Sequence, residues 1–346
     1  MKITKYSALL AAVIAAPAMA QQWQTLPDTP PTPKDNPTTP AKVELGKMLY
    51  FDPRFSSTGT VSCNSCHNVM LGGEDNRPVS VGIEGQKGGR SAPTVWNAAY
   101  LSVQFWDGRE PTLEAQAKGP VINPIEMGME SHEELVNRRL KAITGYKPYF
   151  EKAFGEGDVV NIDNFAKAIA AYERTLITPD SPYSRYVKGD KKALTAQQIS
   201  GMEKFSKLGC GGCHSGGAFA GPAKPLGEGF FMKFPTYTNN EYVNKYNLAE
   251  DVGRFEVTKK ESDKNVWRVP TLLNIALTAP YFHNGTVKTL DEAVRVMAKT
   301  QLNKDLSDQD VADIVAFLNG LTGEFPEQTM PRLPATPDSV IADMKK

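Results

Sequence analysis

The chain has 346 residues, with 39 acidic and 39 basic side chains, so its formal net charge at neutral pH is zero. This balance argues against binding to nucleic acids, which requires a basic surface. After residue 20, no apolar stretch reaches the length of about 18–20 residues that a membrane-spanning helix needs, so the mature chain is expected to be soluble or peripherally attached.

The N-terminus has the pattern of an export signal over residues 1–20. Two lysines precede a short apolar run, and Ala18-Met19-Ala20 resembles a cleavage site. This pattern predicts a periplasmic or exported cell-surface protein. Residues 21–40 are rich in proline and threonine, a composition typical of an extended, weakly ordered leader.

Helical patterns recur along the rest of the chain, whereas the alternation of a half-buried strand does not. The predicted helices cover residues 41–51, 132–143, 164–177, 196–205, 290–298 and 308–318. All but the first have a predicted N-cap, namely Ser131, Asp163, Thr195, Thr289 and Ser307. Long loops rich in Gly and Pro separate them, so the fold class is predicted to be mostly α with long loops.

Two short runs contain all four cysteines of the chain, Cys63-Asn64-Ser65-Cys66-His67 and Cys210-Gly211-Gly212-Cys213-His214. Each is a C-x-x-C-H run, the attachment signature of a c-type haem. The thiols can form thioether bonds to the two haem vinyl groups, and the adjacent histidine can bind the iron as the proximal ligand. A zinc half-site or a redox dithiol also uses C-x-x-C, but two copies that both end in histidine favour two covalent haems.

The chain also repeats itself after each of these runs. Three blocks recur at a constant offset of 177 residues: 92–97 with 269–274, 105–108 with 282–285, and 112–114 with 289–291. We therefore predict two homologous cytochrome c-like haem domains, residues 41–180 and 181–346. The haem motifs themselves are offset by only 147 residues, so the second domain is predicted to carry about 30 extra residues, within 218–264.

The second axial ligand of each iron is a separate question, because a haem with two protein ligands transfers electrons and a haem with an open position binds small molecules. Outside the two motifs the chain has only two histidines, His132 and His283. His132 lies among glutamates and is expected at the surface, whereas His283 is expected near a haem edge. Methionine is the other option, and the spacing alone does not choose among Met70, Met127, Met129 and Met297.

Taken together, these features resemble the bacterial dihaem cytochrome c peroxidases over nearly the whole mature length. Besides the two haem motifs, the resemblance is carried by Gly72-Gly73, Phe105-Trp106-Asp107-Gly108-Arg109, Gln116, Asn123-Pro124-Ile125-Glu126-Met127, and Tyr281-Phe282-His283-Asn284-Gly285 with Met297. It implies an enzyme that reduces hydrogen peroxide with electrons from a small cytochrome c or a cupredoxin. Members of the family commonly form homodimers, which makes a homodimer the oligomeric state to test.

The resemblance implies different roles for the two haems. The C-terminal haem would be the high-potential site of electron entry, with His214 and Met297 as its axial ligands. The N-terminal haem would be the peroxide site, with His67 as its proximal ligand. A calcium ion would lie between the domains, bound by three backbone carbonyls, those of Ser91, Thr278 and Pro280. Ser91 replaces the more usual asparagine, which a carbonyl ligand tolerates.

Three further side chains match the catalytic machinery of the family. Trp106 would lie between the haems as an electron bridge. Gln116 and Glu126 would form the distal pair at the peroxide site, where Gln116 orients the substrate. Glu126 would move a proton between the two peroxide oxygens, a form of general acid–base catalysis.

One position departs from the family pattern. Many members carry a histidine in a Ser-x-Gly-His run that blocks the peroxide iron until the other haem is reduced. Here the run reads Ser80-Val81-Gly82-Ile83, and isoleucine cannot bind iron. We therefore expect the N-terminal haem to be open without reductive activation.

Two alternatives come from neighbouring functional classes. The methylamine-utilisation dihaem enzymes oxidise tryptophans of a partner protein, and they carry tyrosine where this chain has Met297, which counts against that reading. A plain electron-transfer dihaem cytochrome would need both irons capped by protein ligands. Suitable ligands near the first haem motif are too few for that reading.

Overall fold

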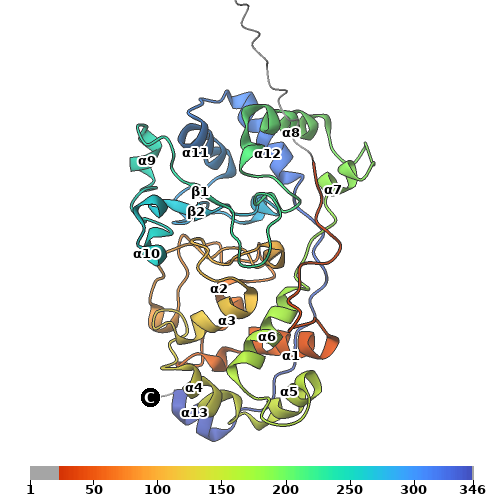
Figure 1. Ribbon diagram of the computed structural model, residues 1–346, viewed down its shortest axis with the longest axis vertical. Coiled ribbons are helices and arrows are strands. Elements are labelled where there is room, and N and C mark those ends of the chain that lie inside the picture. The colour runs from red at the N-terminus through yellow and green to blue at the C-terminus, as the bar shows by residue number, and fades with distance from the viewer. Residues whose placement is uncertain (1–22, 345–346) are drawn as a thin grey trace, which may run out of the picture.

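The computed structural model describes residues 23–344, so the expected export signal lies outside the described residues (Figure 1). The fold is mostly helical, as predicted. The helices are α1 Pro40–Phe51, α2 Cys63–Cys66, α3 Leu113–Ile122, α4 His132–Leu135, α5 Lys147–Phe154, α6 Ile162–Glu173, α7 Pro182–Val187, α8 Ala196–Leu208, α9 Glu241–Lys245, α10 Phe255–Thr258, α11 Leu290–Leu302, α12 Asp308–Asn319 and α13 Asp338–Met344. Two short antiparallel strands, β1 Phe231–Lys233 and β2 Val266–Arg268, pair with Met232 opposite Trp267.

The same helix packing occurs in both halves of the chain. In the first half α1 packs on α6, and in the second α8 packs on α12. Each pair meets at a glycine, because a Cβ at Gly46 of α1 would overlap the carbonyl of Ala168, and one at Gly201 of α8 would overlap that of Asp313. Only glycine allows the backbones to approach so closely, and in each half the first helix of the pair, α1 or α8, leads into a C-x-x-C-H run.

The repeat detected in the sequence is also present in the backbone. Asn97 and Asn274 are both left-handed, with φ of 63° and 60°, and Phe105 and Phe282 follow with φ of 67° and 71°. Each half then closes the loop with an antiparallel bridge, Gln104–Glu110 in the first and Tyr281–Val287 in the second. Positive φ is unusual for phenylalanine, so its recurrence at the same offset supports an internal duplication.

Thr178 lies at the junction of the two halves and joins their equivalent asparagines. Its buried hydroxyl accepts hydrogen bonds from the side-chain amides of Asn97 (2.8 Å) and Asn274 (3.0 Å). The side-chain carbonyl oxygen of Asn274 accepts a hydrogen bond from the backbone amide of Gly323. The two halves are therefore held together by a polar joint as well as by apolar contacts.

The leader differs from the weakly ordered segment that its composition predicted. From Trp23 it is extended, but it is packed against the rest of the molecule. The Trp23 ring lies 5.8 Å from that of Phe317, and Asn36 is fully buried, where its amide donates to Glu114. Apolar and polar contacts of this kind order a proline-rich chain that has no regular structure of its own.

The C-terminal segment corrects the predicted domain boundary. After α12 the chain returns to the first half, where α13 lies near α4 at the opposite end of the molecule from α12 (Figure 1). Val340 of α13 joins the first-half core, and Arg54 donates to the carbonyl of Pro334 and to Thr336. Residues from about 325 to 344 therefore belong in space with the N-terminal half.

Most predicted helices are present, with two differences. Asn161 rather than Asp163 caps α6, since its side chain accepts from the amide of Asn164, and the helix ends at Glu173 instead of continuing to residue 177. The helix expected over residues 132–143 is regular only in α4 and continues as a π-turn, Val136–Leu140. This wider turn accompanies the burial of Arg139, which pairs with Asp343 of α13.

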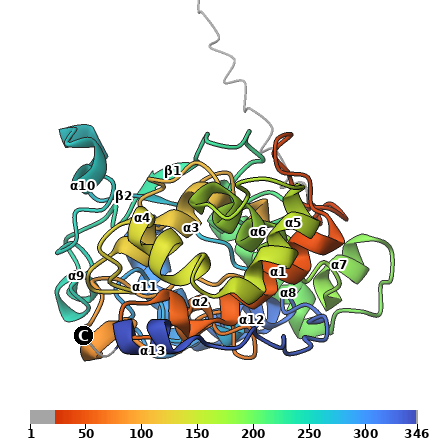
Figure 2. The ribbon, with the colours of Figure 1, turned by 90° about the horizontal axis from the view of Figure 1, so that it is seen from below.

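The extra residues of the second half include α9, α10 and β1. Figure 2 shows α9 and α10 at one side of the molecule and α7 at the opposite side. Between residues 23 and 344, the structure has no helix that is both long and apolar enough to cross a membrane.

Candidate functional site

The two C-x-x-C runs form single helical turns that bring their thiols together. The first forms α2, which begins after Ser62, and the second is a 3-10 turn, Cys210–Gly212, which follows a left-handed Gly209. Residues three apart lie on the same face of a helical turn. All four cysteines are free and partly exposed, so each pair presents two thiols to one ligand.

Both motif histidines are oriented by a backbone carbonyl. Nδ1 of His67 lies 2.9 Å from the carbonyl oxygen of Pro93, and Nδ1 of His214 lies 3.0 Å from that of Phe219. Because a carbonyl only accepts, Nδ1 carries the hydrogen and Nε2 is left with its lone pair. Burial lowers the pKa of both rings, which keeps them in the neutral form that binds a metal.

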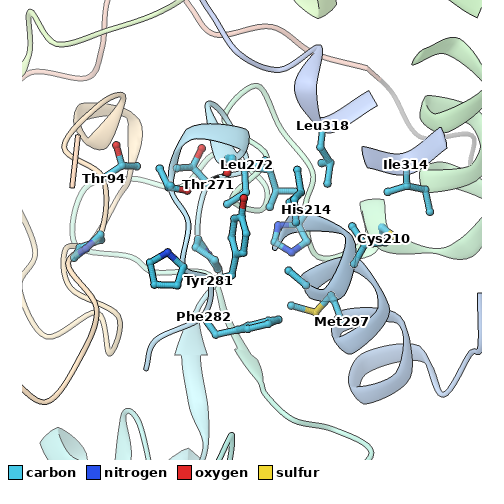
Figure 3. A pocket seen from close by; sticks show the side chains of 18 of the residues that line it. Thr94, Cys210, His214, Thr271, Leu272, Tyr281, Phe282, Met297, Ile314 and Leu318 are labelled. Atoms are coloured by element: carbon cyan, nitrogen blue, oxygen red, sulfur yellow. Dashed lines mark hydrogen bonds between the residues drawn. The ribbon is translucent and has the colours of Figure 1, made fainter. Parts of the chain in front are cut away.

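Each motif opens into a chamber. The N-chamber, with a cavity volume of about 350 Å³, is lined by Cys66, His67, Gln116 and Glu126 among others. The C-chamber consists of two adjoining cavities of about 170 and 90 Å³, both of which reach Cys210, His214 and Met297. Figure 3 shows Met297 extending from α11 into the cavity that His214 also lines. A thiol pair, a free Nε2 and a largely apolar wall fit a covalently attached haem in each chamber.

Trp106 lines both chambers, which no spacing argument could have established. It borders the N-chamber and both cavities of the C-chamber. Its indole nitrogen donates to the carbonyl oxygen of Ser91 at 2.9 Å. The ring is thereby held in the wall between the two haem motifs.

The structure brings Gln116 and Glu126 into the same chamber as His67. Gln116 projects from α3, and Glu126 lies in the turn that follows it. The side-chain amide of Asn123 donates to Oε1 of Glu126 at 3.0 Å. Burial raises the pKa of Glu126, and the nearby Arg109 opposes that shift.

Ile83 lies outside the chambers, among the apolar residues of the first-half core. Its amide donates to the carbonyl oxygen of Glu126 at 3.0 Å, and its side chain fills the space beside Gly128. The neighbouring Gly82 packs so closely on Ile125 that a Cβ there would overlap the Ile125 carbonyl. The loop that contains Ile83 is therefore fastened to the turn that contains Glu126.

The other axial-ligand candidates occupy different places. Met70 is 79% exposed, and Met129 is buried in the first-half core. Met127 lines a separate, smaller cavity that also reaches Cys63 and His67. His132 contacts the carbonyl of Lys118 through Nε2, away from both motifs. Of the four methionines, only Met297 shares a chamber with His214.

His283 is buried in the wall of the C-chamber, where its ring stacks on Trp267 with the ring centres 4.2 Å apart. Burial lowers its pKa to about 4, so the ring is neutral at ordinary pH. Among residues 23–344 its Nε2 has no hydrogen-bond partner. The position near a chamber wall agrees with the expectation from the sequence.

The three residues expected at the calcium site lie along one cavity. Ser91, Thr278 and Pro280 all border the larger part of the C-chamber. The carbonyl of Ser91 already accepts the hydrogen of Trp106, which leaves one lone pair. No cluster of three or more His, Cys, Asp or Glu side chains suited to a metal occurs in the described part of the chain, so a cation here would rest on backbone oxygens.

Two buried charged residues that line the chambers were not predicted from the sequence. Glu173 lines the N-chamber from α6, and burial raises its pKa to about 8. The sequence pattern that could have indicated its burial is its position four residues after Ile169, on the apolar face of a predicted helix. Arg268 lines the C-chamber from β2, where a cation interrupts the apolar run Val266-Trp267-Arg268-Val269.

Comparison with known proteins agrees with this geometry. The profile of the di-haem cytochrome c peroxidases matches residues 40–192. The cytochrome c551 peroxidase of Pseudomonas aeruginosa is 46% identical over 319 residues, which cover 92% of this chain and 89% of the relative. The chain belongs to the di-haem cytochrome c peroxidase family. Membership of this family implies two haems.

Two further comparisons extend the family assignment. The cytochrome c551 peroxidase of Nitrosomonas europaea is 43% identical over 291 residues, covering 84% of this chain and 83% of that one. The crystal structure of a MauG-like protein associated with microbial copper homeostasis aligns with a TM-score of 0.75 at 31% identity, over 88% of this chain and 96% of that one. This di-haem cytochrome c peroxidase chain is thus more similar in sequence to the two named peroxidases than to the MauG-like protein.

Proposed function

We propose that this chain is a periplasmic dihaem peroxidase that reduces hydrogen peroxide to water. The observation that carries the proposal is the convergence of Glu126 and Gln116 on the chamber of His67. The names of the two cytochrome c551 peroxidases, at 46% and 43% identity, support the same reaction. When bound, the two haems supply the redox chemistry, because their irons store and transfer the two electrons that the reaction consumes.

Within the N-chamber, Glu126 is the proton-transfer group. Its carboxylate takes a proton from one oxygen of hydrogen peroxide and returns it to the other, so that water leaves when the O–O bond breaks. Such general acid–base catalysis typically contributes about 10²–10⁴-fold to the rate. The raised pKa of Glu126 favours this role, because it brings the carboxyl closer to the pH at which it must both accept and donate. The Gln116 side chain orients the peroxide, and Asn123 holds Glu126 in place.

Electrons enter through the C-chamber from a small cytochrome c or a cupredoxin. His214 and Met297, which line the same cavities, would hold the haem of that chamber, and a His–Met pair would give that haem a high reduction potential. Trp106, in the wall that both chambers share, is the bridge for electron transfer between them. Its hydrogen bond to Ser91 keeps the ring in that position.

We further propose that the N-terminal haem would have an open coordination position in the fully oxidised protein. Ile83 supplies no ligand, and its burial in the core keeps the loop fastened to the turn of Glu126. Electron paramagnetic resonance of the oxidised, as-isolated protein tests this point. We expect one high-spin and one low-spin ferric haem, and two low-spin signals would contradict an open site.

A calcium ion held by the carbonyls of Ser91, Thr278 and Pro280 is part of the same proposal. These residues border the cavity that also contacts Trp106, so the ion would stabilise the wall between the chambers. Removal of calcium by a chelator is expected to slow electron transfer between the haems. The remaining parts of the proposal are export through residues 1–20, a homodimer in solution, and two haem domains divided near residue 180, with residues from about 325 to 344 packed on the first.

The alternative function is oxidation of tryptophans in a partner protein, as in the methylamine-utilisation enzymes. The similarity to a MauG-like structure at 31% identity favours it, and Met297 speaks against it. Steady-state assays separate the two functions. We expect peroxide-dependent, catalytic oxidation of a reduced small cytochrome c or cupredoxin, whereas inertness towards all such donors would favour the partner-oxidising enzyme. The third possibility, a plain electron-transfer cytochrome, predicts no turnover of peroxide at all.

A further inference from the structure

Arg268 is a buried cation without an anion. Its side chain is only 4% exposed, and it forms no ion pair with any residue from 23 to 344. The guanidinium makes two hydrogen bonds, from Nε to the carbonyl of Phe105 (3.0 Å) and from Nη1 to that of Val269 (3.3 Å). Burial lowers the pKa of this guanidinium to about 10, since only the more distant Asp107 opposes the effect.

The other arginines of the interface are neutralised by the protein. Arg90 donates to Asp107 at 2.5 Å and to Asp251 at 2.6 Å, and Arg109 donates to Asp107 at 2.9 Å. Buried charges in proteins are ordinarily paired, because an isolated charge in an apolar environment is strongly destabilising. Arg268 therefore differs from its neighbours in needing a negative group that the described part of the chain does not supply.

The missing anion belongs in the C-chamber. Arg268 lines both cavities of that chamber, as the only cationic side chain in either, and no described aspartate or glutamate lines them. The polar groups nearby are already engaged, because Thr271 donates to the carbonyl of Ala218 and Trp106 donates to Ser91. The whole residue is only 4% exposed, so it offers almost no surface to a carboxylate on another protein.

We propose that Arg268 binds a propionate carboxylate of the haem held by His214 and Met297. Haem carries two propionates, and a haem bound in this chamber would bring these anions with it. A guanidinium with Nη2 unused among the described residues can donate a charge-assisted hydrogen bond to such a carboxylate. The inference rests on the proposed two-haem assignment and adds to it a residue that sets the reduction potential of one haem.

The backbone of Arg268 gives this contact a second consequence. Its amide donates to the carbonyl of Trp106 at 2.9 Å, while its Nε donates to the carbonyl of Phe105. The residue that binds the propionate is thus fastened to the segment that carries the bridging tryptophan. Arg268 is a positioning residue for electron transfer between the chambers as well as a cofactor-binding residue.

The experiment compares Arg268→Met, Arg268→Lys and Arg254→Met in the two-haem protein. Arg254 is the matched control, because it donates to the carbonyls of Asp107 and Gly108 across the same interface but lines neither chamber. Spectroelectrochemical titration gives the midpoint potential of each haem. We expect Arg268→Met to lower the potential of the low-spin haem alone, since loss of a nearby cation favours the ferric state, and to make that potential depend on pH.

The charge-conserving variant and the control complete the test. Arg268→Lys is expected to keep most of the potential while shifting the propionate bending mode in resonance Raman spectra, and Arg254→Met is expected to change neither. An unchanged potential in Arg268→Met with both haems loaded would overturn the inference, as would an equal shift in Arg254→Met. If Arg268→Met does not fold, an unchanged bending mode in Arg268→Lys would overturn it. Absence of the second haem from the wild-type protein would instead refute the proposed function.

Discussion

The amide nitrogen of Ile83 lies 3.0 Å from the carbonyl oxygen of Glu126, so the loop after the first C-x-x-C-H run is joined to the turn that contains Glu126, the proposed proton-transfer group. The side chain at this position points into the core, where it packs beside Gly128. Ile83, which cannot bind iron, therefore has a structural role. Its contacts fasten the loop to the turn that contains Glu126.

Replacement of Ile83 by alanine should weaken both functions of this contact. The lost side chain would leave a cavity in the first-half core, which typically costs about 2–5 kcal/mol of unfolding free energy. The looser turn should also lower kcat/KM for peroxide. Chemical denaturation and steady-state kinetics measure the two effects. Ile122→Ala, at a 38% exposed position, is the control and should change neither appreciably.

Replacement of Glu126 by glutamine should remove the proton shuttle while preserving the shape of the N-chamber. We expect kcat/KM for hydrogen peroxide to fall by about 10²–10⁴-fold, with both haems still attached. The exposed Glu130, four residues further on, provides the matched control Glu130→Gln. A Glu126→Gln enzyme with normal turnover would assign the proton transfer to another group, and Glu173 in the same chamber would be the next to test.

Replacement of Met297 by histidine should keep the second haem low-spin but lower its potential. Axial ligands tune haem potentials over a span of ~0.8 V, and a fall on the order of 0.1 V or more is expected here. Redox titration followed in the visible spectrum measures it. Met232 of β1 also lines the C-chamber, so Met232→Leu is the control. A fall in potential in Met232→Leu but not in Met297→His would identify Met232 as the ligand.

Glu173 should make the stability of the protein depend on pH. Its folded-state pKa of about 8 lies above the ordinary value of 4.5, so across that window the folded chain retains a proton that the unfolded chain releases. Unfolding free energy should therefore fall as pH rises through the window, by at most about 1.4 kcal/mol per pH unit, and then level off. Glu173→Gln lacks this loss, so its Tm should exceed that of the wild type by a gap that widens with pH. The exposed Glu133 gives a control, since Glu133→Gln should show no such gap.

The short motifs and most of the helix caps could be predicted from the amino-acid sequence. The C-x-x-C-H runs and the helix caps at Thr195, Thr289 and Ser307 are short-range patterns, and the structure bears out these caps. At the constant offset of the repeat, the backbone adopts the same positive φ angles. Helix ends were less certain, because Asn161 and Asp163 both suit an N-cap and only the backbone geometry selects Asn161. The family resemblance added the grouping of Gln116, Glu126 and His67, which are brought together in one chamber.

What the sequence by itself determined is the position of the two C-x-x-C-H runs that are proposed to hold the haems, since this motif consists of residues that are close together in the chain. Only the tertiary structure decided how those sites are connected: Trp106 in a wall shared by both chambers, Ile83 turned into the core, the leader packed from Trp23, and the last residues returned to the first half. The environment of Arg268 was also decided by the tertiary structure. An arginine in an apolar run indicates a binding site only when its surroundings show that it is buried without a counter-charge. The physical reason is that burial and charge pairing depend on contacts between residues distant in the chain, and spacing along the sequence does not record those contacts.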